Sequence, residues 1–184
     1  MIDHPDTRTL LMNSMMELMS VKPVDKISVR EITENCRVST RSFYNHFKDK
    51  HDLVNAIYMS EENDLFSLQP QPDIISKRSL VNLFAYVKKN RKFYDNACSY
   101  MGQNNLLTYI YEQGYVRVIE GIRAQDKVDD VDESLCFAAK MWLNGMKDMI
   151  TLWLNGGCVL SPERLTDLIF FASPECMLKY INEN

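Results

Sequence analysis

Apolar residues recur every three or four positions along most of the chain, and this spacing places them on one side of an α-helix. The first such stripe includes Leu10, Leu11, Met15, Leu18 and Met19. Every strongly periodic segment follows the same spacing, so the sequence predicts an all-α protein. The expected helices span approximately residues 6–20, 28–35, 39–47, 49–65, 74–89, 91–101, 104–124, 130–155, 161–171 and 175–182.

Capping residues mark several of the expected helix ends. The segment "SVRE" (28–31) is a capping box, in which Ser28 accepts a hydrogen bond from the third helical N–H and Glu31 reaches back. Ser39 and Asp49 are candidate N-caps of the next two helices. Later in the chain, "NGG" (155–157) is typical of a helix end, and "SPE" (161–163) combines a cap with proline at the first helical position.

A proline-containing segment divides the predicted helices into two groups. Proline disfavours helix at its own position and at the residue before it, and "SLQPQPD" (67–73) holds two prolines. The sequence therefore predicts an N-terminal three-helix domain over residues 1–50, with a last helix at about 49–66 that leads onward. A C-terminal helical bundle is expected over residues 70–184.

Composition changes this picture little, but the distribution of charge matters. The chain has 184 residues, of which 46% are hydrophobic and 25% charged, as in ordinary globular proteins. Its net charge of −4 does not by itself indicate nucleic-acid binding, yet residues 37–51 hold four Lys or Arg against a single acid. Because the field near a phosphate is local, an acidic chain with a basic patch of this kind can bind DNA.

The cysteine spacing and the lack of catalytic motifs predict a cytoplasmic protein that is not an enzyme. The five cysteines are far apart and form no C-x-x-C pair, which predicts reduced thiols. No apolar run approaches the roughly 20 residues needed to span a bilayer, and the first residues lack a secretory pattern. No nucleophile motif, phosphate loop or metal-ligand spacing is present, so we expect no enzyme activity, cofactor or metal ion.

The two short helices at 28–35 and 39–47 have the spacing of a helix-turn-helix motif. If Val38, Phe43 and Phe47 face the core, the opposite face of the second helix carries Thr40, Arg41, Tyr44 and Asn45. Arginine suits guanine, asparagine suits adenine, and threonine can contact a thymine methyl group in the major groove. The alternative is a capped helix pair in an ordinary bundle, with a polar face in solvent.

The segment "KISVREITENCRVSTRSFYNHFKDKHDLV" resembles the N-terminal DNA-binding domain of the TetR family of transcriptional regulators. Two positions depart from the family pattern, because Arg37 stands where glycine is usual and Cys36 replaces alanine. A non-glycine residue would then occupy a left-handed turn conformation. The matching positions are Ser28–Val29, Ile32–Thr33, Val38–Ser39, Ser42–Phe47, Lys50 and Leu53.

The resemblance implies a set of DNA contacts. Thr40, Arg41 and Asn45 are the expected sequence readers, whereas phosphate contacts position the domain without reading bases. Lys50 and His46 are expected on the phosphate side, although His46 has the alternative role of a packed histidine at the helix junction. The full predicted set comprises Thr7, Arg8, Ser28, Arg37, Ser39, Thr40, Arg41, Ser42, Tyr44, Asn45, His46 and Lys50.

The C-terminal helices at 130–155 and 161–171 are apolar over too much of their surface for a solvated pair. A single helix-turn-helix contacts few base pairs, so two copies one DNA turn apart are expected. We predict a symmetric four-helix interface between two copies, with an intramolecular core as the alternative. The predicted interface residues are Leu135, Ala138, Met141, Trp142, Gly145, Met149, Leu152, Leu168 and Phe171.

Aromatic side chains crowd the middle helices, where the resemblance implies an effector-binding domain. Few charges lie among them, so a ligand would be a small apolar or aromatic molecule, although such a stripe is more often plain core. "NRKFYDNACSYMGQNN" (90–105) and "WLNGG" followed by "SPERL" further resemble regulators of dihydroxyacetone kinase operons. The predicted pocket residues are Tyr86, Phe93, Tyr94, Tyr100, Tyr109 and Trp142, with Tyr111 and Tyr115 nearby.

Together these patterns predict a DNA-binding transcriptional regulator rather than an enzyme. The expected form is a homodimeric repressor that binds a near-palindromic operator in double-stranded DNA and is released by an effector. The alternative is an activator or co-regulator controlled by a protein partner or by oxidation of a thiol, with Cys98, Cys136 and Cys158 as candidates.

Overall fold

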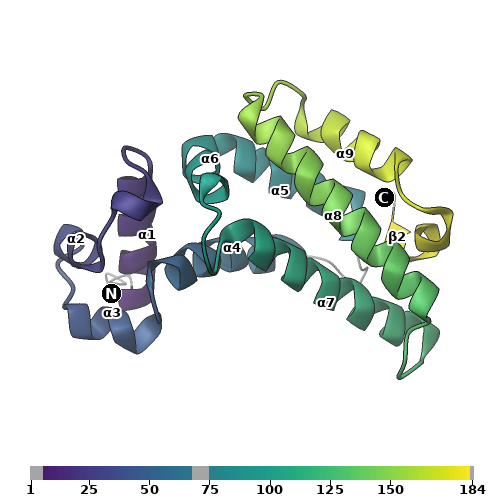
Figure 1. Cartoon of the computed structure of the whole chain (residues 1–184), viewed down its shortest axis with the longest axis horizontal. Coiled ribbons are helices and arrows are strands. Elements are labelled where there is room, and N and C mark those ends of the chain that lie inside the picture. Colours follow the sequence, from purple (N-terminus) through teal and green to yellow (C-terminus); the bar gives the residue numbers. More distant parts are fainter. Residues whose placement is uncertain (1–5, 68–74, 183–184) are drawn as a thin grey trace, which may run out of the picture. The chain divides into compact units, whose positions relative to one another are not determined.

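The computed structural model describes residues 6–67 and 75–182, and most of them are helical (Figure 1). Among these residues, no helix combines the length and the apolar character needed to cross a bilayer. Two short 3₁₀ segments are η1 (Val24–Lys26) and η2 (Glu175–Tyr180). The helices are α1 (Thr7–Met19), α2 (Val29–Asn35), α3 (Thr40–His46), α4 (Lys50–Ser67), α5 (Lys77–Lys89), α6 (Arg91–Ser99), α7 (Leu106–Asp126), α8 (Glu133–Asn155) and α9 (Pro162–Phe171).

The all-α prediction is confirmed, and the differences lie at a few element ends. The start predicted at residue 74 moves to Lys77, because Ile75 and Ser76 form a short extended segment, β1. β1 pairs in parallel with β2 (Ile181–Asn182) at the end of the described chain. The final helix predicted over 175–182 is therefore a 3₁₀ turn followed by this strand. Residues 68–73 of the segment predicted as a domain boundary lie outside the described residues.

The chain forms two compact units. The N-terminal unit comprises the residues up to Glu61 together with Arg91–Leu106, and the C-terminal unit comprises Glu62–Asn90 together with the residues from Leu107 onward. The predicted division was contiguous in sequence. The structure instead groups α6 and the segment after it with the N-terminal helices, because α6 packs against α1.

The core of the N-terminal unit lies where α1 meets α2, α3 and α6. A buried polar bond supports this packing, because the Ser14 hydroxyl of α1 donates to the Ile32 carbonyl of α2 at 2.8 Å. The Asn35 side chain at the end of α2 donates to Ser14 and to Glu17 of α1, both at 3.1 Å. The fully buried apolar side chains here include Leu11, Met15, Ile32, Phe43 and Leu53.

The C-terminal unit is organised around the packing of α5 against α9. Lys77 at the start of α5 forms an ion pair with Asp167 of α9 at 2.7 Å. The ring of Phe84 on α5 meets Trp153 of α8 edge to face, with the centroids 5.9 Å apart. At the far end of α7, Asp126 accepts hydrogen bonds from Lys179 and Tyr180 of η2, which fastens the C-terminal segment to this unit.

Candidate nucleic-acid interface and apolar groove

The turn between α2 and α3 has the geometry of a Schellman motif. The Val38 N–H donates to the Thr33 carbonyl at 2.9 Å, and the Arg37 N–H donates to the Glu34 carbonyl at 3.2 Å. Arg37 lies in the left-handed region with φ 57°, as predicted for a non-glycine residue at this position. Its side chain is exposed. The turn thus directs an arginine into solvent immediately before α3 begins.

One face of helix α3 is polar and exposed, and the opposite face carries buried aromatic side chains. Ser39 caps the helix by accepting from the Ser42 N–H at 3.0 Å, and the two hydroxyls bond to each other at 2.8 Å. Phe43 is fully buried and Phe47 nearly so, with their centroids 5.7 Å apart. On the outward side, the exposed side chains are Thr40, Arg41, Tyr44, Asn45 and His46.

The Tyr44 ring packs against Phe43 on one side and is exposed to solvent on the other. It meets Phe43 edge to face at 5.3 Å, yet the residue is 58% exposed. An aromatic contact of this kind orients the ring, so its hydroxyl projects away from the core. Four outward groups therefore extend from one helix: a hydroxyl, a guanidinium, a phenol and an amide. These are the side-chain types that recognise base edges and phosphates.

The start of α1 lies beside the last turn of α3. The Arg8 guanidinium is positioned over the Phe47 ring, 5.7 Å from its centroid, and is exposed. Asp6 caps α1 by accepting from the Thr9 N–H at 2.7 Å. This backbone hydrogen bond, with smaller contributions from Arg8 and His46, lowers the pKa of Asp6. Thr7, the first residue of α1, is half-buried.

His46 lies in the exposed part of α3. Its ring centroid is 6.3 Å from that of Phe47, with the planes tilted by 46°. The residue is exposed, unlike the packed histidine at the helix junction that was the alternative. Three basic side chains of the turn and α3 are therefore exposed to solvent: Arg37, Arg41 and His46.

Two predicted contact residues are engaged within the protein. The Lys50 ammonium donates to the carbonyls of Val24, Asp25 and Ile27 at 2.8, 3.1 and 2.8 Å. Ser28 forms the predicted capping box, accepting from the Glu31 N–H while Glu31 accepts from the Ser28 N–H. Hydrogen bonds to Lys22 and then to Ser28 lower the pKa of Glu31 to about 2.

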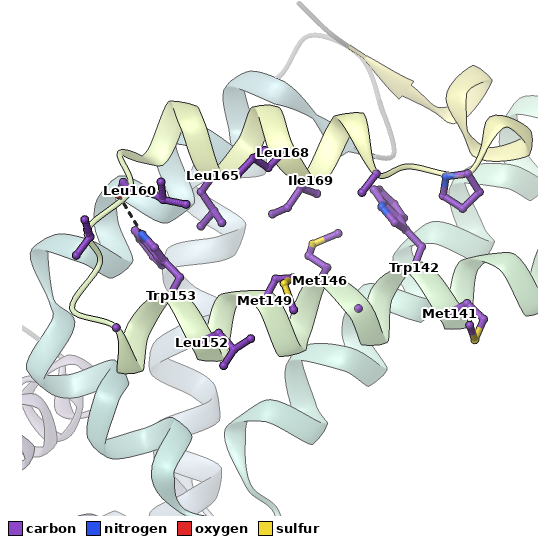
Figure 2. A pocket seen from close by; sticks show the side chains of 15 residues that line it. Met141, Trp142, Met146, Met149, Leu152, Trp153, Leu160, Leu165, Leu168 and Ile169 are labelled. Carbon is purple, nitrogen blue, oxygen red and sulfur yellow. Dashed lines mark hydrogen bonds between the residues drawn. The ribbon is translucent and has the colours of Figure 1, made fainter.

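An open apolar groove of about 720 Å³ runs between α8 and α9 (Figure 2). Trp142, Met146 and Trp153 project from α8 toward α9, and the Trp153 indole donates to the Leu160 carbonyl at 3.0 Å. No charged side chain lines the groove among the described residues. Its lining includes six of the nine residues predicted to form an interface between two copies: Met141, Trp142, Gly145, Met149, Leu152 and Leu168.

The apolar surface extends beyond the groove. Phe171 on α9 is 91% exposed, whereas the predicted residues Leu135 and Ala138 are half-buried and do not line the groove. Sequence reasoning missed Val159, which lines the groove and is 84% exposed, and Phe137, which lies outside it and is 65% exposed. A signal for Phe137 was present, because it lies one helical turn before Met141.

The predicted effector residues are divided between the two units. Phe93, Tyr94 and Tyr100 belong to the N-terminal unit, where Tyr100 stacks on His51 with the centroids 4.1 Å apart. Tyr86 and Tyr109 belong to the C-terminal unit and are half-buried. Of the six, the described groove includes Trp142 alone.

Two other predicted aromatic residues, Tyr111 and Tyr115, are half-buried on α7. The rings of Tyr111 and Tyr115 stack at 6.5 Å, and two lysines of α8 cover them. The Lys147 ammonium lies 5.9 Å from the Tyr111 centroid, and the Lys140 ammonium lies 5.3 Å from the Tyr115 centroid. This arrangement joins α7 to α8 by cation–π contacts.

The thiols differ in exposure. Burial raises the pKa of Cys98 to about 12, and the nearby Asp95 adds to the rise. Cys158 is also buried, Cys36 and Cys136 are intermediate, and Cys176 is exposed. Because the thiolate is the reactive form, the environment of Cys98 disfavours reaction at neutral pH.

Comparison with known families agrees with this geometry along most of the chain. Residues 11–57, which contain the helix-turn-helix, match the family described as "Bacterial regulatory proteins, tetR family". Residues 76–172 match the family described as "Transcriptional regulator C-terminal region". The chain belongs to the TetR family and is a DNA-binding transcriptional regulator.

Solved structures show the same fold at low sequence identity. The dihydroxyacetone kinase operon activator DhaS is 18% identical with a TM-score of 0.66, and the match covers 95% of this chain and 97% of that chain. A TetR regulator from Rhodococcus sp. RHA1 is 12% identical with a TM-score of 0.63, covering 95% and 98%. A Streptomyces coelicolor regulator is 20% identical with a TM-score of 0.55, covering 89% and 77%. No curated protein sequence matches the chain significantly.

Proposed function

We propose that the protein acts as a homodimeric repressor that binds a near-palindromic operator and leaves it when an effector binds. The observation that carries the proposal is the exposed polar face of α3, held over the buried Phe43 and Phe47. A short helix with this face suits the major groove, which presents a distinct pattern of donors and acceptors for each base pair.

The residues of the recognition surface have two proposed roles. Arg41, Asn45 and Thr40 read bases, since their outward side chains match guanine, adenine and the thymine methyl group. Arg37, at the exposed turn, and Arg8, beside the end of α3, contact phosphates and thereby set the register. Tyr44 and His46 lie between these groups on the same helix and complete the surface.

The groove between α8 and α9 supports the dimeric part of the proposal. Met149, Leu152 and Leu168 are exposed there, and covering them would remove a continuous apolar surface from water. A symmetric pairing of α8 and α9 with the same helices of a second copy gives an isologous four-helix interface. Two recognition helices can then engage half-sites one DNA turn apart.

Repression is the simplest consequence of such a dimer on promoter DNA, because the bound protein excludes polymerase. An effector releases the dimer only if it binds a non-binding conformation more tightly than the DNA-binding one. Within the C-terminal unit, the half-buried Tyr86 and Tyr109 suit a small apolar or aromatic effector. A protein partner remains the alternative source of the signal.

Activation is the second candidate, because DhaS is described as an operon activator and has a similar fold. Transcription in vitro from a promoter that carries the bound site distinguishes activation from repression. A decrease in transcript on adding the protein supports repression. An increase establishes activation and overturns the repressor assignment.

The test of DNA recognition is selection of bound sequences from a random duplex pool. Wild-type protein is compared with Arg41→Ala and Tyr44→Ala, and Lys127→Ala in the C-terminal unit is the control. We expect a two-fold-symmetric site for wild type and control, with relaxed sequence preference in Arg41→Ala. Absence of enrichment by the wild type at low salt, where even non-specific binding is strong, would contradict the proposal.

A further inference from the structure

The connection between α1 and α2 is held by two side chains that come from distant parts of the sequence. Lys50 of α4 donates from one ammonium group to the carbonyls of Val24, Asp25 and Ile27. Asn96 of α6 donates to the Met19 and Lys22 carbonyls at 2.9 and 2.7 Å and accepts from the Val24 N–H at 2.8 Å.

The Lys50 contacts use the whole hydrogen-bonding capacity of its side chain. An ammonium group has three N–H donors and no acceptor, and all three donors have carbonyl partners here. Burial lowers the pKa of Lys50, the direction expected for an ammonium that has partly left water. A phosphate could recruit this group only by displacing a backbone carbonyl.

The Asn96 amide completes the same connection from the other side. Its two N–H donors and its carbonyl oxygen all engage backbone groups between residues 19 and 24. The two sets of contacts meet at Val24, the first residue of η1, whose own backbone bonds run from the Lys26 N–H to the Pro23 carbonyl and from the Ile27 N–H to the Val24 carbonyl. The segment from α1 to α2 is therefore fixed by long-range side chains as well as by its local turn.

The position of this segment bears on the recognition surface. It joins α1, whose first turn lies beside α3, to α2, whose last residue begins the turn into α3. A change in the connection alters the relation of α1 to α2, and with it the position of Arg8 relative to Arg41. DNA recognition requires Arg8 and Arg41 to keep a fixed position relative to each other, so that phosphate contacts hold the base-reading side chain at the correct place on the duplex.

We propose that Lys50 and Asn96 are positioning residues for DNA binding, acting through the α1–α2 connection without contacting DNA themselves. The inference rests on the proposed DNA recognition by α3. It assigns Lys50 a different role from the phosphate contact implied by family resemblance.

The test compares salt dependence as well as affinity. Each phosphate contact contributes about −0.9 to the slope of log K against log[salt]. On the enriched duplex, we expect Lys50→Met and Asn96→Ala to weaken binding roughly tenfold, the effect of a lost charged or multiple hydrogen bond, with the wild-type slope retained. Arg37→Met, at a proposed phosphate contact, is expected to reduce the magnitude of the slope by about one.

Matched controls separate positioning from general damage. Lys48→Met removes an exposed lysine two residues from Lys50, and Ser99→Ala removes a hydroxyl of α6 that donates to the Asn96 carbonyl of its own helix. Neither is expected to change the hydrogen-exchange rates of the Val24 and Ile27 amides. Lys50→Met and Asn96→Ala are expected to speed this exchange in the absence of DNA, at temperatures where the helices stay folded.

The outcomes are distinct. A slope reduced by about one in Lys50→Met would show a phosphate contact and overturn its positioning role. Wild-type affinity in folded Lys50→Met and Asn96→Ala would also overturn the inference, since the connection would then be irrelevant to recognition. Failure of the wild type to bind any duplex would instead remove the proposed function, and the inference with it.

Discussion

Arg37 occupies a backbone conformation that L-residues with a side chain adopt at a cost. Its φ of 57° lies in the left-handed region, where glycine is free of the steric penalty. We predict that Arg37→Gly leaves the free energy of unfolding unchanged or raises it by up to about 1 kcal/mol, while operator affinity falls. Thermal unfolding and fluorescence anisotropy with the enriched duplex measure the two effects.

A control for this prediction exists in the other unit. Lys127 has φ 55° and is exposed at the end of α7. Lys127→Gly should relieve the same backbone cost while operator affinity stays at the wild-type level. Equal loss of affinity in both glycine variants would show that Arg37 contributes nothing specific to DNA binding.

Cys98 is predicted to be inert in the native protein. Its burial and its pKa of about 12 leave almost no thiolate at neutral pH, whereas Cys176 is exposed. Alkylation followed by peptide mass mapping should modify Cys176 and spare Cys98 until denaturant is added. Rapid native modification of Cys98, accompanied by peroxide-sensitive DNA binding in Cys176→Ser, would instead support control by thiol oxidation.

At the scale of the element, the Glu31 carboxylate, which pairs with Lys22 and caps α2 at Ser28, is expected to give the N-terminal unit an acid-sensitive component. The pKa of Glu31 is about 2 in the folded protein against an ordinary value of 4.5. A lowered carboxylate pKa stabilises the fold above the unfolded value, and this contribution is lost as the pH falls from about 4.5 toward 2. We predict that Glu31→Gln unfolds at a lower temperature than wild type at pH 7 and that the difference shrinks across this window.

The comparison needs a carboxylate of the same helix that caps nothing. Glu34 pairs with Arg30 one turn away on the exposed surface, so Glu34→Gln is the control. Its melting curve should follow that of the wild type through the same pH range. Parallel curves for wild type and Glu31→Gln between pH 4.5 and 2 would contradict the role assigned to the Glu31 carboxylate.

Gly145 in the middle of α8 offers a test of how closely α8 meets a second copy. A Cβ built there meets no heavy atom within 4 Å, so the single chain leaves room for a side chain. Gly145→Leu should therefore fold, with a gain of about 1 kcal/mol in helix propensity, yet dissociate as a dimer because the added side chain separates the paired helices. Analytical ultracentrifugation measures this dissociation.

Gly114→Ala is the matched change on α7, where the nearest atom to a new Cβ is a Leu143 methyl carbon at an ordinary 3.5 Å. It should stabilise its helix and leave the association unchanged. A Gly145→Leu protein that dimerises like wild type would show that the helices of the two copies do not approach each other closely at Gly145.

Most helix positions could be predicted because local rules determine them. α9 begins at Pro162 after Ser161, and α2 begins after Ser28, since a cap and a proline specify a helix start by themselves. The β1–β2 pair was missed because Ile75 and Ile181 are far apart in sequence. No local signal indicates such a pairing.

The exposed polar face of α3 could be predicted for the same reason. Thr40, Arg41 and Asn45 fall on the exposed side once Phe43 is assigned to the core, and a single helix determines that geometry. The carbonyl contacts of Lys50 depend on how the α1–α2 connection folds back toward α4. The role of Asn96 depends on the packing of α6 against α1. Both sets of contacts join residues that are far apart in the sequence, so the periodicity of apolar residues does not predict them.

For the whole molecule, the groove predicts an obligate link between assembly and DNA binding. We expect a dimer in solution, and we expect Met149→Glu to raise its dissociation constant roughly a hundredfold, because a carboxylate would be buried without a partner. Operator affinity should fall in parallel. Sedimentation velocity and anisotropy titration, performed over the same concentrations, measure both.

Val128→Glu provides the control, since it also replaces an exposed apolar residue of the C-terminal unit but does not line the groove. It should remain dimeric and bind the operator normally. A Met149→Glu protein that is monomeric yet binds the palindromic site with wild-type affinity would separate dimerisation from recognition and refute the proposed arrangement.

The discontinuity of the N-terminal unit has a consequence for how the protein is made. Domains generally fold in order as they leave the ribosome, but this unit includes Arg91–Leu106. When α4 has emerged, the nascent chain still lacks Asn96, so the α1–α2 connection has only its Lys50 partner. The DNA-binding unit therefore cannot complete its native contacts until α6 has been translated, well after the recognition helix itself.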